Sequence, residues 1–165
     1  NAVIGQGFTL VTPLQLANAL ATIVNGGNYY EPSVIDHIED QLGNVVETHQ
    51  PELARQVAMD PKTVQLISEG MWGTVNSPQG TAYRYLHNSP GNFIAKTGSA
   101  ETFRTVDGQL IPGVHGWIVG AFDYDGHKYT FAVHMAFGGG GWNAVQVMQK
   151  FAKCLFSDFA PQCQY

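Results

Sequence analysis

Three β-prone runs follow one another between residues 92 and 136, and they limit the fold more than any other feature of the sequence. The runs read NFIAKTGSAETF, HGWIVGAFDY and KYTFAVHMAF. The last two are joined by Asp125-Gly126, and an Asp-Gly pair between apolar runs is a strong signal for a β-hairpin. The sequence therefore predicts an antiparallel meander of three strands.

A segment with the signals of a well-defined helix precedes the predicted sheet. Over residues 12–25, Thr12 and Gln15 are placed for a capping box, and Gly26-Gly27 would end the helix. Six apolar positions recur at helical spacing and form one broad face, so we expect this helix to be largely buried. They are Leu14, Leu16, Ala17, Leu20, Ala21 and Val24.

The remaining segments give an α+β order, in which an antiparallel sheet is flanked by helices and the last helix packs on the sheet. Trp117 and Trp142 are expected in the core rather than on a substrate surface. The segments are a hairpin over 33–49 turning at Gly43-Asn44, a helix over 60–75 capped by Asp60, a loop over 76–91 and a closing helix over 142–156.

Composition argues against several classes of function. The net charge is −5 without a basic cluster, so nucleic acid is not an expected partner. The six histidines and two cysteines lack the spacing of a metal site, and we expect neither a metal nor another cofactor. No apolar run approaches the roughly 18 residues that cross a membrane. A hydrophobic content of 44% is enough for a packed core.

The first β-prone run ends in residues that a purely structural strand would not need. Lys96, Thr97, Gly98 and Ser99 follow directly on the apolar residues 93–95. A cation, two hydroxyls and a bare backbone together suit an anionic substrate. K-T-G is also a signature of serine acyl-transferases that act on penicillin-like substrates. A three-residue match can arise by chance, so its context has to support it.

That context is a series of further motifs in one order along the chain: GQGFTLVTPLQLANALATIVNGG, EGMWGTVNSPQGTAYRY, AKTGSAE, HGWIVGAF and FGGGG. With them the chain resembles the C-terminal half of the transpeptidase domain of class B penicillin-binding proteins, specifically the elongation-type penicillin-binding protein 2 family. The resemblance implies the fold shared by penicillin-binding proteins and serine β-lactamases. Residues 1–165 would then form the C-terminal part of a single transpeptidase domain.

The resemblance also implies an activity and a site. The activity is that of a peptidoglycan D,D-transpeptidase, which cross-links D-Ala-D-Ala stem peptides and is acylated by β-lactams. Lys96 and Ser99 would be catalytic, with the Lys96 cation facing the substrate carboxylate and the Ser99 amide stabilising the oxyanion. The hydroxyls of Thr97 and Ser99 would bind the carboxylate, while Gly98 and Ala100 complete the substrate-binding strand.

The expected nucleophile is missing from this chain. No serine is followed by lysine in an S-x-x-K pattern, and no S-x-N has a convincing context. Both motifs lie upstream in the family, so the N-terminal part of the same domain is an expected partner and this chain alone should be inactive. Gly80-Thr81 match a family loop that borders the cleft, which implies a positioning role. A β-lactam sensor domain and a β-lactamase of the same superfamily are the alternative functions.

The family's location bears on the two cysteines. The resemblance implies the cell-wall side of the bacterial cytoplasmic membrane, an N-terminal anchor outside this chain, and a membrane glycosyltransferase and elongation-machinery proteins as partners. That compartment permits disulfides, so a bridge between Cys154 and Cys163 is expected. Reduced thiols are the alternative.

Two other features have ordinary explanations. His115 opens the second β-prone run, and a satisfied histidine in the sheet is at least as good an interpretation as a cleft residue. The glycines 138–141 are not followed by G-K-[ST], so we interpret them as a turn that lets the closing helix approach the sheet.

Overall fold

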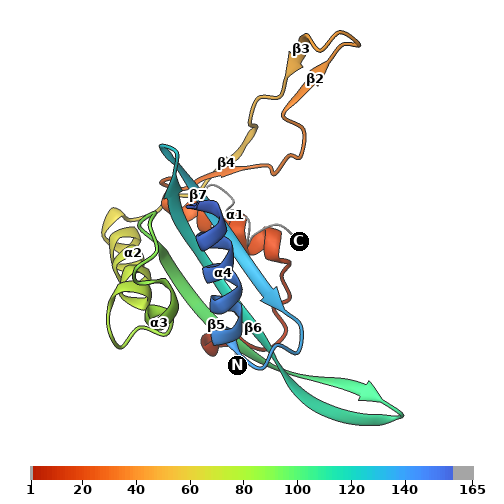
Figure 1. Cartoon of the computed structure of the whole chain (residues 1–165), viewed down its shortest axis with the longest axis vertical. Coiled ribbons are helices and arrows are strands. Elements are labelled where there is room, and N and C mark those ends of the chain that lie inside the picture. The colour runs from red at the N-terminus through yellow and green to blue at the C-terminus, as the bar shows by residue number, and fades with distance from the viewer. Residues whose placement is uncertain (1, 158–165) are drawn as a thin grey trace.

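The centre of the molecule is a three-stranded antiparallel sheet, which confirms the predicted meander. The computed structural model describes residues 2–157. The sheet has the order β5-β6-β7, so β5 and β7 are its edges within the described residues. The strands are β5 (Ile94–Val106), β6 (Gln109–Tyr124) and β7 (His127–Met135) (Figure 1).

β5 and β6 are longer than predicted, because they continue as a hairpin beyond the rest of the sheet (Figure 1). Their pairing runs to Val106 opposite Gln109, around a turn at Asp107-Gly108. Both turn residues have positive φ, 50° and 77°, as the tight turns of hairpins require. The side chains of residues 103–112 are exposed, so no buried apolar alternation marks this part of the sequence as strand.

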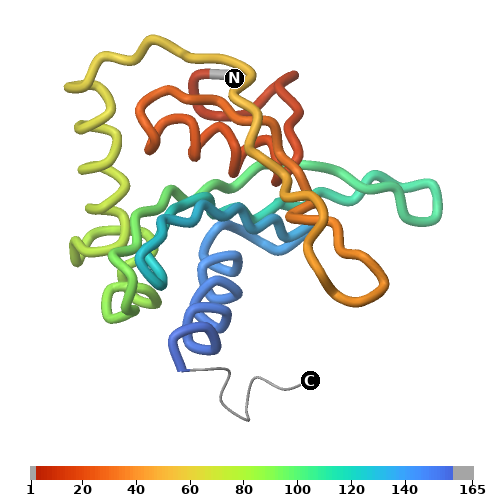
Figure 2. Tube along the Cα trace, turned by 90° about the horizontal axis from the view of Figure 1, so that it is seen from above, coloured from red at the N-terminus to blue at the C-terminus, as the bar shows by residue number. Residues whose placement is uncertain are grey.

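Two helices enclose the sheet, one on each face, as Figure 2 shows. Helix α4 (Gly141–Leu155) covers one face and confirms the predicted packing of the closing helix. Helix α1 (Pro13–Val24) covers the other, and α2 (Pro61–Asn76) runs beside β5. The main core lies under α4 and contains Val75, Ala82, Leu86, Phe93, Ala95, Ile118, Phe122, Ala144, Val145, Met148 and Ala152.

Two burial predictions are wrong. Helix α1 has the predicted capping box between Thr12 and Gln15, but only Leu20 of its six apolar face residues is buried, and Leu14 is 62% exposed. Leu14 lines an open pocket beside Tyr29 and Arg55. Trp142 is 56% exposed, because Gly141 takes the position of the first turn of α4 that faces the sheet.

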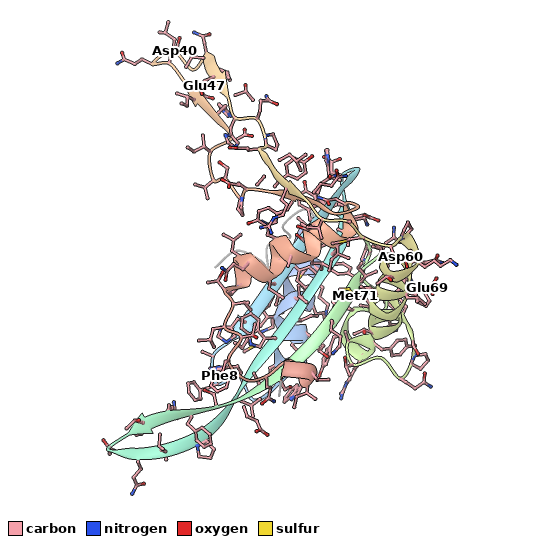
Figure 3. All side chains as sticks on the ribbon, turned by 180° about the vertical axis from the view of Figure 1, so that it is seen from behind. Phe8, Asp40, Glu47, Asp60, Glu69 and Met71 are labelled. Atoms are coloured by element: carbon pink, nitrogen blue, oxygen red, sulfur yellow. The ribbon has the colours of Figure 1, made fainter. Side chains whose placement is uncertain are left out.

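A narrow arm stands away from the body of the molecule, with Asp40 and Glu47 near its far end (Figure 3). It contains the predicted hairpin of β2 (His37–Glu39) and β3 (Val45–Thr48). At its base, β1 (Asn28–Tyr30) pairs with β4 (Leu53–Gln56), a ribbon that sequence reasoning missed. Strands this short carry little periodicity.

Two short helical turns complete the described chain. The segment predicted as a loop over 76–91 contains α3 (Tyr83–Leu86), whose Leu86 is fully buried in the main core. A 3₁₀ turn, η1 (Ala2–Ile4), precedes the segment that leads to α1. Among residues 2–157, no helix has both the length and the apolar character needed to span a membrane.

Candidate functional site

The K-T-G residues lie on β5, an edge strand whose outer side is free of strand pairing in the described structure. Phe93 O accepts from the Asn76 side chain at 3.4 Å, and Thr97 O accepts from Lys96 Nζ at 2.7 Å. Both carbonyls therefore point away from β6. Because backbone groups alternate in direction along a strand, the Ser99 N–H points to the same free edge. The predicted oxyanion donor is thus oriented outward.

A groove of about 690 Å³ runs along this part of β5. One wall is the N-terminal segment between η1 and α1, and the other is the sheet. All five predicted substrate-binding residues, Lys96 to Ala100, line the groove, together with His115 and Trp117. Lys96 is exposed there. The structure thus gathers the sequence-predicted residues on one open surface. His115 was expected as an ordinary sheet histidine and Trp117 as a core residue, but Trp117 is only half-buried and both residues line the groove.

The hydroxyl of Thr97 is held by the loop after α2. Thr81 Oγ1 and Thr97 Oγ1 lie 2.6 Å apart, a short hydrogen bond between residues from separate elements. Gly80 permits this approach, because a Cβ there would lie 2.3 Å from Thr74 O. Gly80 and Thr81 are therefore placed as a positioning role requires, and that role stays a prediction.

The hydroxyl of Ser99 is held from the opposite side of the strand. Gly141 N donates to Ser99 Oγ at 3.0 Å, from the first residue of α4. This backbone donor was missed in the sequence, although the run FGGGG marks the place. An oxygen that already accepts from an amide keeps its own proton for an acceptor in the groove.

The glycine run brings the end of α4 against the strands, as predicted. A Cβ on Gly141 would lie 2.7 Å from Gly98 O, and one on Gly116 would lie 2.3 Å from Gly140 O. Side chains at these positions would separate the helix from the sheet. The close approach also places the positive N-terminal end of the helix macrodipole beside Ser99, which favours an anion there.

Aromatic and imidazole rings continue the site along β6 and β7. Trp117 is half-buried, stacked on His134 with the ring centroids 4.1 Å apart, and the His115 ring lies 5.0 Å from that of His134. Burial lowers the pKa of His134, and the charge of His115 lowers that pKa further. These two rings are therefore held next to each other with His134 biased toward its neutral form.

Two further predictions concern metals and the disulfide. No group of three or more His, Cys, Asp or Glu side chains within residues 2–157 is arranged to hold a metal ion. Cys154 lies in the last turn of α4 and Cys163 lies outside the described residues, so the bridge between them stays a prediction.

A family match and curated relatives show what the chain as a whole is similar to. Residues 1–153 match the penicillin binding protein transpeptidase domain. The chain is 27% identical to the peptidoglycan D,D-transpeptidase MrdA of Salmonella typhimurium over 98% of this chain and 27% of the relative. It is 31% identical to MrdA of Escherichia coli K12 over 61% of this chain and 16% of the relative. The chain thus spans about a quarter, or less, of the length of the curated relatives it matches.

Solved structures share the fold. A ceftriaxone acyl-enzyme complex of penicillin-binding protein A from M. tuberculosis aligns with a TM-score of 0.70 and 23% identity, over 92% of this chain and 34% of that one. Penicillin-binding protein 2 of Helicobacter pylori, solved in complex with MreC, aligns with a TM-score of 0.63 and 23% identity, over 94% of this chain and 26% of that one. The observed α+β architecture is therefore that of penicillin-binding proteins.

Proposed function

Because this chain belongs to the penicillin-binding protein transpeptidase domain family, we propose that it carries one wall of the active site of a peptidoglycan D,D-transpeptidase. The observation that supports this most is the edge of β5, where Lys96, a free Ser99 N–H and two fixed hydroxyls face one groove. We call the polypeptide that combines these residues with the rest of the domain the whole enzyme. Its nucleophilic serine lies outside this chain, which has no S-x-x-K.

The proposed division of labour follows from the chemistry of acyl transfer. A serine from the other part of the domain attacks the carbonyl carbon of the penultimate D-Ala, and the terminal D-Ala leaves as the free amino acid. An acceptor amine of a second stem peptide then displaces the serine and forms the cross-link. The Ser99 N–H donates to the tetrahedral oxyanion, which is worth about 3 to 4 kcal/mol per donor in comparable sites.

Recognition of the terminal carboxylate is assigned to the side chains of the same strand. The hydroxyls of Thr97 and Ser99 donate to it, since Thr81 and the Gly141 amide fix their positions. Lys96 adds a positive charge that attracts the carboxylate, and hydrogen bonds to a charged group are stronger than neutral ones. β-Lactams carry a carboxylate and a reactive carbonyl in a similar relation, and they would acylate the enzyme by the same contacts.

The relatives are the basis for the partners and the location that we propose for the whole enzyme. The complex of the Helicobacter pylori protein with MreC supports contact with elongation-machinery proteins, and a membrane glycosyltransferase is the expected second partner. We place the whole enzyme on the cell-wall side of the bacterial cytoplasmic membrane, anchored by a segment outside this chain.

The proposal is tested with a fluorescent penicillin and the whole enzyme. We expect one stable covalent adduct per molecule, on a serine outside these 165 residues, and release of D-Ala from a stem pentapeptide in the presence of an acceptor amine. Absence of both reactions would contradict the proposal. Rapid hydrolysis of the penicillin would indicate a β-lactamase, and a stable adduct without D-Ala release would indicate a sensor.

A further inference from the structure

The loop that joins β7 to α4 is fastened to β6 at three points. Phe137 N donates to His115 Nδ1 at 3.2 Å, and Gly139 N donates to Val114 O at 3.0 Å. The Phe137 ring lies over Gly113, where a Cβ would come within 2.4 Å of it. The loop therefore follows the backbone of β6 rather than arching into solvent.

The backbone of Phe137 is strained, so contacts with the rest of the protein are required to hold it in this conformation. Its φ is 53°, in the left-handed region that bulky residues rarely adopt. Two further contacts hold the ring: the Arg104 guanidinium lies 5.2 Å from its centroid, and the centroid of the His115 ring also lies 5.2 Å from it. The hydrogen bond to His115 is the contact that fixes the amide itself.

Phe137 precedes Gly141 by four residues, so its position affects where the Gly141 amide lies. Asn143 of α4 donates to Gly138 O, so the start of the loop is bonded to the start of the helix. Gly141 N then reaches Ser99 Oγ at 3.0 Å. Because glycines 138–141 have no side chains to set their course, the backbone bonds of Phe137 to His115 and of Gly139 to Val114, together with the start of α4, determine where the Gly141 amide points.

We propose that His115 is a positioning residue for Ser99. Its Nδ1 accepts the Phe137 amide, which keeps Nε2 as the protonated nitrogen and holds the loop so that Gly141 N meets the Ser99 hydroxyl. The inference rests on the proposed function, since it assigns the orientation of Ser99 a role in binding the carboxylate. His115 thereby acts on the substrate through the loop and not by contact.

Three substitutions of His115 separate this role from direct contact and from packing. Asn places an acceptor where Nδ1 stood, Gln places its polar atoms nearer to Nε2, and Phe keeps the ring packing against His134 and Phe137 without an acceptor. If the amide bond to Phe137 is what matters, His115→Asn recovers most of the acylation rate. His115→Gln and His115→Phe lose about fivefold to tenfold, as expected for one hydrogen bond.

A double-mutant cycle in the whole enzyme provides the decisive readout. The second-order rate constant for acylation by a fluorescent penicillin is measured for wild type, His115→Phe, Ser99→Ala and the double variant. We expect His115→Phe to cost less than about twofold once the Ser99 hydroxyl is absent, because residues acting through one another are not additive. Thermal unfolding of each variant accompanies the kinetics.

Two results would overturn the inference: fully additive costs in the cycle, or recovery by His115→Gln rather than by His115→Asn. If His115→Phe unfolds, the comparison of His115→Asn with His115→Gln still decides the point, since both of these side chains lack the ring. These outcomes differ from failure of the proposed function, in which the wild-type whole enzyme itself forms no adduct.

Discussion

The amide nitrogen of Gly141 lies 3.0 Å from the hydroxyl oxygen of Ser99 and joins the first turn of α4 to the edge strand β5. The Ser99 hydroxyl is thereby bonded on the side away from the groove, with its proton available toward the groove. The Thr97 hydroxyl oxygen is hydrogen-bonded to that of Thr81, 2.6 Å away, and either hydroxyl can be the donor. Two hydroxyls that a bare strand would leave rotating are therefore oriented in advance for an anion, which reduces the ordering cost of binding.

Lys96→Ala in the whole enzyme should slow acylation by about a hundredfold or more, as removal of a charged group from a transition-state site does. The fold should survive, because the Lys96 side chain is exposed. Lys150→Ala is the matched control, since Lys150 is an exposed lysine on α4. Equal acylation rates for the two variants, measured with a fluorescent penicillin, would show that Lys96 has no role in the site.

Thr97→Val keeps the shape of the side chain and removes a hydroxyl that we assign to the carboxylate. Its expected cost is about 1.5 to 3 kcal/mol in acylation. Thr81→Val removes only the partner 2.6 Å away and should cost less, about 1 kcal/mol. Thr105→Val on the distal hairpin serves as control. A larger loss of acylation rate in Thr81→Val than in Thr97→Val would contradict the assignment of the carboxylate contact to Thr97.

Gly98→Ala and Gly141→Ala should separate function from folding. A Cβ at Gly98 would meet only Trp117 Cβ at 3.5 Å, an ordinary contact, whereas a Cβ at Gly141 would lie 2.7 Å from Gly98 O. Gly98→Ala should therefore leave the thermal midpoint nearly unchanged while acylation falls. Gly141→Ala should destabilise by about 1 to 3 kcal/mol through overpacking. If calorimetry showed a larger loss of stability in Gly98→Ala than in Gly141→Ala, the close approach of α4 to β5 would be contradicted.

His134 should titrate below the ordinary histidine value of about 6.5, because burial lowers its pKa and the charge that His115 carries once it is itself protonated lowers that pKa further. As pH falls through that ordinary value, the unfolded chain binds a proton that the folded chain does not. The folded state therefore loses stability as the pH falls below the ordinary histidine pKa. Above that pH, His134 has no effect on the pH dependence of stability. In His115→Asn, an NMR titration should show the pKa of His134 raised; an unchanged value would mean that burial alone sets it.

Much of the fold could be predicted because its signals are local. The capping box at Thr12 and the turn at Asp125-Gly126 specify their elements without reference to the rest of the chain. The outer half of the β5–β6 hairpin could not be predicted from burial, since its side chains are exposed. The burial of α1 could not be predicted, because which elements pack against a helix face depends on the tertiary structure.

The site shows the same division. Lys96, Thr97, Gly98 and Ser99 were found because they are consecutive and form a motif. Their supports come from residues remote in the sequence: the Gly141 amide is 42 positions from Ser99, and Thr81 is 16 positions from Thr97. A backbone amide leaves no trace in residue type, so only the glycine run that permits its approach could have pointed to it.

A crystal structure of the whole enzyme acylated by a penicillin tests the assignment of the β5 edge most directly. We predict that the penicillin carboxylate lies within hydrogen-bond distance of the hydroxyls of Thr97 and Ser99, with the acyl carbonyl oxygen accepting from the Ser99 N–H. The Gly141 amide should still donate to Ser99 Oγ in that structure. A carboxylate bound elsewhere, with β5 contributing no contact to the acyl group, would contradict the assignment.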